Sequence, residues 1–180
     1  MIASADWVMI VLRFFHIVGG ALWVGSAFLF VAVIGPAAAD VGPKAGPLME
    51  VAVKKYKVSK RITVFATSAV AAGWLLWLKD LRDYDWHVST WVFHSGGFGL
   101  ALTLGGILAS IAWYEGLFHV GKGVEELVDV GSEIAASEGP PPPEKIARVQ
   151  AIQQSLMVHG RVDIVLLLLA VTFMSTARYW

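Results

Sequence analysis

The sequence predicts an all-α integral membrane protein, a bundle of four transmembrane helices in one domain. Of its 180 residues, 57% are hydrophobic and only 16% are charged. The mean hydropathy of +0.65 is too high for an ordinary soluble domain. Four apolar segments are long enough to cross a bilayer, which takes about 20 residues each. The length of 180 residues allows one compact bundle and no separate globular domain.

The spans are expected at about residues 7–34, 62–78, 91–118 and 157–178. The first ends where Gly35 and Pro36 follow the apolar run. The second is short and rich in alanine, as a packed interior helix is, and the third is dense in glycine, which lets a neighbour approach closely. The fourth ends in an interfacial anchor of one arginine and two aromatic residues.

The loops at residues 35–61 and 119–156 are expected in the cytoplasm, with both termini on the outer or periplasmic side. Basic residues set this orientation. The two loops hold Lys44, Lys54, Lys55, Lys57, Lys60, Arg61, Lys122, Lys145 and Arg148, whereas the opposite side shows only Lys79, Arg82 and Arg178. The second loop is acidic, and its halves predict a short amphipathic helix and a helical lead-in to the last span. The pattern indicates a multi-pass protein of a bacterial inner or plasma membrane.

Composition excludes several classes of function. The formal net charge is zero, so no basic surface points to nucleic acid. The absence of cysteine excludes disulfides, thiolate nucleophiles and iron–sulfur clusters. A bound metal would have to use histidine, carboxylate or methionine ligands.

His16 is the first candidate functional residue, because an ionisable group inside an apolar span is costly and usually has a task. A rise of 1.5 Å per residue puts it about 13 Å below Trp7, and puts His94 about 12 Å below Trp86. We therefore expect these two imidazoles to ligate one haem b from opposite sides, between the first and third spans. The alternative is a purely structural role, in which His16 forms a hydrogen bond across helices and His94 lies at the membrane interface.

Three kinds of neighbour would serve such a haem. Gly20 and Gly97 would leave room for the ring, although such glycines are more often plain helix packing. Trp23 would contact the ring or pack in the core. Arg13 would pair with a propionate or extend to the headgroups.

A second polar cluster gathers at the cytoplasmic ends of the later spans, formed by Arg61, Glu115, His119, His159, Arg161 and Asp163. One interpretation is an ion-pair network that lets charged helix ends pack. The other is a second haem or a metal site around His119 and His159, or a proton path that serves a quinone.

The first span, LRFFHIVGGALWVG, resembles a signature of bacterial membrane proteins that reads LRxxHxxxGxxWxG. These include the membrane domain of urate oxidases of the PuuD type, the copper-resistance D family and the haem-containing membrane protoporphyrinogen oxidases. The matching residues are Leu12, Arg13, His16, Gly20, Trp23 and Gly25. The resemblance implies a helical bundle with His16 as a haem b ligand, and it covers about one sixth of the chain. No haem-c motif, mid-membrane lysine or methionine cluster accompanies it.

These patterns predict a b-type cytochrome-like protein that transfers electrons between a quinone or redox enzyme and a partner protein. The first alternative is a haem-dependent membrane oxidoreductase acting on a small substrate such as a porphyrinogen. The second is a cofactor-free structural or assembly subunit of a membrane complex. A homo-oligomer and a larger complex are both compatible with the sequence.

Overall fold

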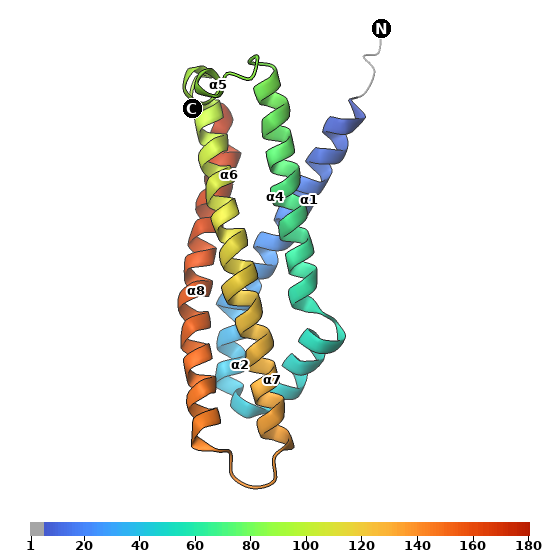
Figure 1. The fold of residues 1–180 in the computed structure, drawn as a ribbon, viewed down its shortest axis with the longest axis vertical. Helices are drawn as coiled ribbons and strands as arrows, with labels where there is room; N and C mark the ends of the chain where they lie inside the picture. Colours follow the sequence, from blue (N-terminus) through green and yellow to red (C-terminus); the bar gives the residue numbers. More distant parts are fainter. Residues whose placement is uncertain (1–5) are drawn as a thin grey trace.

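Residues 6–180 are described in a computed structural model, and none of them lies in a β-strand. Four long helical segments run side by side (Figure 1). Each contains a helix long and apolar enough to span a bilayer, which confirms the predicted all-α four-helix membrane bundle. The start of the first helix and the C-terminus lie at one end of the bundle, here called the terminal end. The opposite end is called the loop end.

The first long segment continues well past its expected end at residue 34. It consists of α1 (Trp7–Leu29), the π-helical η1 (Phe30–Ile34), α2 (Gly35–Val41), the short 3-10 helix η2 (Gly42–Ala45), α3 (Gly46–Glu50) and the π-helical η3 (Val51–Lys55). The three prolines of this region do not interrupt it, because each occupies the first turn of a helix, where its missing N–H is not needed. The expected loop at residues 35–61 is therefore mostly helical.

The next two segments differ from expectation at their ends. The second is α4 (Val58–Arg82), longer at both ends than residues 62–78. The third begins with a separate short helix, α5 (Val88–His94), and then runs through α6 (Phe98–Glu115), the π-helical η4 (Gly116–Gly121) and α7 (Lys122–Ala136). Gly96 and Gly97 have φ of 70° and 87°, a left-handed backbone that breaks the helix before Phe98.

The last segment is α8 (Pro143–Thr176), followed by the 3-10 turn η5 (Ala177–Tyr179). It begins 14 residues before the expected 157. Helices α7 and α8 form a hairpin at the loop end, where Arg148 pairs with Glu126 and Lys145 with Glu133. The expected loop at residues 119–156 is thus largely this hairpin.

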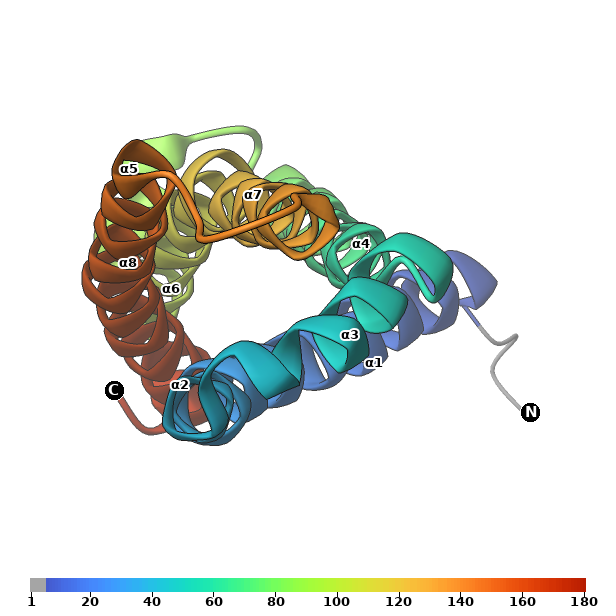
Figure 2. The same cartoon turned by 90° about the horizontal axis from the view of Figure 1, so that it is seen from below.

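Seen from the loop end, the long helices form a ring in which α1 lies beside α4 and α6 beside α8 (Figure 2). Small residues allow both close approaches. A Cβ on Gly19 would lie 2.7 Å from Oγ of Ser68 in α4, and one on Gly105 would lie 2.8 Å from Cγ of Met174 in α8. The main buried cluster between the helices consists of Trp23, Ala27, Ala66, Ala69, Ala112 and Leu167.

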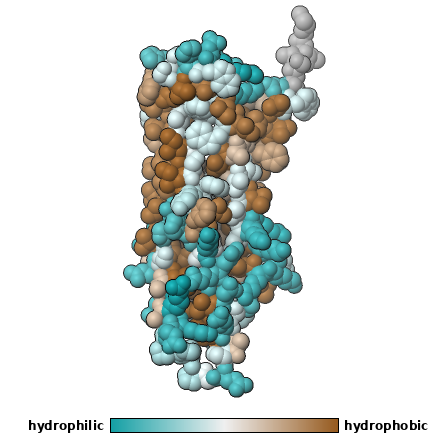
Figure 3. Space-filling model, viewed as in Figure 1, coloured by the Kyte–Doolittle hydropathy of each residue, from teal (hydrophilic) through white to brown (hydrophobic). Residues whose placement is uncertain are grey.

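Hydropathy divides the surface along the long axis. On the face drawn in Figure 3, hydrophobic residues gather over the half nearer the terminal end, while hydrophilic residues dominate toward the loop end. At the rim of the terminal end, Nζ of Lys79 lies 2.6 Å from Oδ2 of Asp6, which also caps α1 by accepting a hydrogen bond from the Met9 amide. The hydrogen bond from Lys79 lowers the pKa of Asp6.

Candidate functional site

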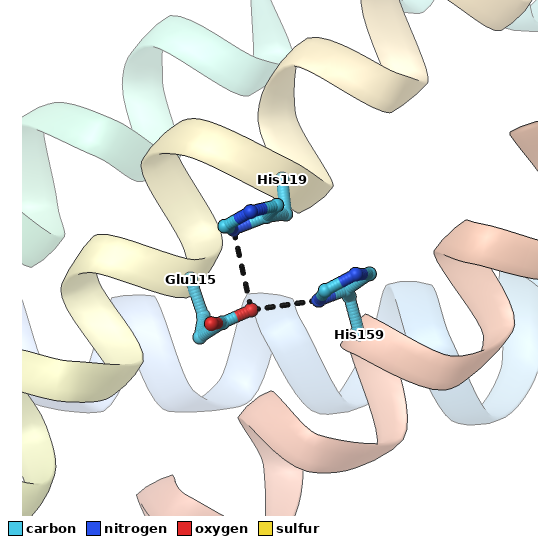
Figure 4. A group of neighbouring side chains, drawn as sticks. All are labelled: Glu115, His119 and His159. Carbon is cyan, nitrogen blue, oxygen red and sulfur yellow. Dashed lines mark hydrogen bonds and ion pairs between the residues drawn. The ribbon is translucent and has the colours of Figure 1, made fainter.

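A carboxylate and two imidazoles converge where α6 passes into η4 beside α8. Glu115 ends α6, His119 follows one turn later in η4, and His159 comes from α8. Oε2 of Glu115 lies 2.8 Å from Nδ1 of His159 and 3.3 Å from Nδ1 of His119 (Figure 4). The carboxylate oxygen therefore joins two helices through charge-assisted contacts.

The two imidazole rings stack on each other, with their centroids 4.5 Å apart and their planes 4° apart. One ligand atom from each of the three residues lies within 4.8 Å of the other two. The side chains of Glu115, His119 and His159 are 20%, 40% and 33% exposed. The cluster is thus held in place by the helices and still open to a ligand.

These donors fit a divalent transition-metal ion. Two ligand atoms bound at about 2.1 Å to one ion, with an angle of about 90–110° between them, are about 3.0–3.4 Å apart. The two contacts of Glu115, at 2.8 and 3.3 Å, lie close to this range. Because the rings are nearly parallel, coordination by both nitrogens requires one ring to turn. The same stacking leaves no space for a macrocycle between the imidazoles, so the donor set suits a bare ion better than a haem.

The rest of the expected polar cluster is arranged differently. Arg61 and Arg161 are exposed, and neither forms a salt bridge within residues 6–180. Asp163, one turn after His159, is only 3% exposed. Glu115 is therefore paired with histidines rather than with arginines, which does not match a mutually neutralising network that includes both arginines.

His16 lies against α4. Its Nδ1 is 2.8 Å from the backbone oxygen of Ala69, and a Cβ on Gly73 would lie 2.8 Å from the same nitrogen. Neither Ala69 nor Gly73 was expected as a partner of His16. Ala69 and Gly73 have the small-xxx-small spacing that is typical of close helix contacts in membranes. This spacing could have indicated that α4 packs closely against a neighbouring helix.

His94 lies elsewhere. It is exposed, ends α5, and has its Nδ1 3.4 Å from the backbone oxygen of Ser89 in its own helix. The equal depth expected for His16 and His94 assumed one straight helix that includes Trp86 and continues past His94. In the structure Trp86 lies in the turn before α5, and the break before Phe98 separates α5 from α6. In Figure 1, α5 lies over the ends of α6 and α8, away from α1. The structure does not bring the two histidines together.

Three of the expected haem neighbours, Gly20, Gly97 and Trp23, pack against protein. Gly20 is near Ala69, and a Cβ on Gly97 would lie 3.0 Å from Trp180. Trp23 is 4% exposed in the core. Arg13 is exposed and forms no salt bridge among the described residues. Haem ligation by His16 stays a prediction.

No family model, curated protein or solved structure matches the chain. Function therefore has to be argued from the chemistry of the described residues. The Glu115, His119 and His159 cluster offers the strongest donor set for this purpose, because it combines three metal-binding side chains from neighbouring elements at contact distance.

Proposed function

We propose that this chain is a multi-pass membrane protein that binds one divalent transition-metal ion through Glu115, His119 and His159. The supporting observation is that one ligand atom from each residue lies within 4.8 Å of the others. Two imidazoles and one carboxylate form a donor set typical of iron, zinc and related ions.

Three protein donors leave coordination positions free for water or a substrate, so a bound ion would supply Lewis-acid or redox chemistry. The chain's own contribution is to position the donors. Glu115 and His119 lie one turn apart and face His159 across the α6–α8 contact, whose close approach depends on Gly105. Holding ligands on rigid helices reduces the ordering that binding would otherwise require.

Cobalt(II) titration of the full-length protein tests this proposal, because cobalt in such a site has visible absorption bands. The protein carries a purification tag without histidine and is stripped with EDTA beforehand. We expect about one cobalt ion per chain. Glu115→Gln, His119→Ala and His159→Ala should each weaken binding at least about tenfold, as losing a ligand costs no less than losing an outer-shell partner.

His87→Ala is the matched control, since His87 is an exposed histidine just before α5 and should leave binding unchanged. Unchanged cobalt affinity in both Glu115→Gln and His159→Ala would contradict the proposal. So would the absence of any binding by the folded wild-type protein, which would leave the cluster as an ion pair between helices.

A second candidate function is electron transfer through a haem b ligated by His16, with a quinone or redox protein as partner. One contact favours it: the bond between Nδ1 and Ala69 fixes the imidazole and leaves Nε2 as the ligand atom. Purified protein should then show a Soret band that His16→Ala abolishes. A carbon monoxide shift would indicate an open iron position. A pigment that survives His16→Ala would exclude this ligand.

A further inference from the structure

A cavity of about 90 Å³ lies inside the bundle, lined by residues of α1, η1, α4, α6, η4, α7 and α8. Its walls are mostly apolar and include the rings of Trp23 and Trp113. The polar side chains that line it are the hydroxyls of Ser59 and Thr63 and the carboxyl group of Asp163. In its lining, an apolar chamber with a few placed polar groups, the cavity is like a small-molecule site, while its volume is below the about 300–1,000 Å³ usual for drug-sized ligands.

Asp163 is the unusual member of this lining. It is 3% exposed, and its Oδ1 has no hydrogen-bond partner among the described residues. That oxygen lies 4.0 Å from the point where a Cβ on Gly116 would stand, and Gly116 also lines the cavity. A buried acceptor without a partner is costly, so a ligand that donates a hydrogen bond here would be favoured.

Two π-helical segments contribute residues to the wall of the cavity. Phe30 and Val31 belong to η1, and Gly116, Leu117, Val120 and Gly121 belong to η4. Each π turn carries an extra residue relative to an α turn, and such turns occur frequently at functional sites. This second observation is independent of the buried carboxyl group and supports a functional role for the cavity.

We propose that the cavity binds a lipid-soluble phenol or hydroquinone, whose hydroxyl group donates a hydrogen bond to the carboxyl group of Asp163. Trp23 and Trp113 provide aromatic surfaces against which a ring can pack. The apolar walls favour a ligand that partitions into the membrane. This site goes beyond the proposed metal site, because none of the three metal donors lines the cavity.

Binding is tested with the full-length protein in lipid nanodiscs, followed by quenching of tryptophan fluorescence. The probes are a decyl-substituted hydroquinone, kept reduced, and its dimethyl ether, which has the same ring and tail without a donor. We expect saturable binding of the hydroquinone and about tenfold weaker binding of the ether, the cost of one buried hydrogen bond. Equal affinity for the two probes, or no saturation, would overturn the proposal.

Asp163→Leu should also weaken hydroquinone binding about tenfold, whereas Asp163→Asn, which keeps an acceptor oxygen, should retain part of it. Thr172→Leu, an exposed site on the same helix, is the control and should bind like the wild type. Wild-type affinity in Asp163→Leu would overturn the proposal. If Asp163→Leu does not fold, the comparison of the hydroquinone with its dimethyl ether on the wild-type protein still tests the proposal. Hydroquinone binding should persist in EDTA and in Glu115→Gln. A negative result for the hydroquinone site therefore leaves the proposed metal site untouched, and the reverse also holds.

Discussion

At the residue scale, two glycines of α1 have contrasting surroundings. A Cβ on Gly19 would lie 2.7 Å from Oγ of Ser68 and 3.0 Å from the backbone oxygen of Phe65. The hydroxyl group can rotate, but the backbone oxygen can move only if α1 and α4 separate. A Cβ on Gly25 would meet nothing within 4 Å. Only the first glycine is required by packing.

Gly19→Ala should therefore lower the free energy of unfolding by about 1–3 kcal/mol, the usual cost of overpacking. Gly25→Ala should cause no loss, because alanine is the better helix former and finds open space. Thermal unfolding in detergent, followed by circular dichroism, compares the two variants. Equal stability of both would show that the α1–α4 contact is looser than the structure has it.

Residue types alone identified part of the candidate site. Glu115, His119 and His159 could be grouped because polar residues at helix ends are few in so apolar a chain. Their convergence on one oxygen could not be predicted, since it depends on how α8 is rotated against α6. The pairing of His16 with His94 relied on depth along a straight helix, which sequence spacing cannot guarantee when a turn precedes the histidine and two glycines follow it.

At the scale of elements, α4 and α6 are joined by a row of tryptophan hydrogen bonds. The indole nitrogen of Trp74 donates to Ser110, that of Trp77 donates to Thr103, and that of Trp113 donates to Thr67. All three distances lie between 2.9 and 3.0 Å. Such polar contacts hold helices together where lipid provides no hydrophobic driving force between them.

The combined variant Ser110→Ala, Thr103→Val and Thr67→Val should lose roughly 2 kcal/mol of stability, at about 0.6 kcal/mol for each bond. Thr172→Val is the control. The Thr172 hydroxyl donates to the carbonyl oxygen of Leu168, four residues earlier, as the hydroxyls of Ser110 and Thr103 do within α6, but it accepts no hydrogen bond from an indole. Unfolding in sodium dodecyl sulfate measures both. If the control loses as much stability as the triple variant, the loss comes from the hydroxyl bonds within each helix and not from the tryptophan bonds between helices.

Element boundaries were predictable only where the apolar pattern changes. The prolines of residues 36–47 suggested a loop, yet each lies in the first turn of a helix, where proline is tolerated. The amphipathic pattern of residues 122–156 did predict helices, and α7 with the start of α8 occupies most of that region. Local signals thus gave the type of element more reliably than its ends.

At the scale of the whole molecule, the bundle is much longer than a bilayer is thick. The helix from Phe98 to Ala136 has 39 residues, which corresponds to about 58 Å against about 30 Å of hydrocarbon. The hydrophilic surface toward the loop end in Figure 3 indicates which part extends into water. Nine of the 14 basic residues belong to the stretches 35–61 and 119–156 that form this end. Basic residues favour the cytoplasmic side, so the loop end should project into the cytoplasm.

Single cysteines test this orientation cleanly, because the chain has no cysteine of its own. Ser137 lies in the turn after α7 at the loop end, and Ser89 lies in α5 at the terminal end; both are exposed. In intact cells, a membrane-impermeant maleimide should label Ser89→Cys and should reach Ser137→Cys only after permeabilisation. The reverse labelling would place the metal-binding cluster toward the outside, and the metal supply to the site would then have to be extracellular.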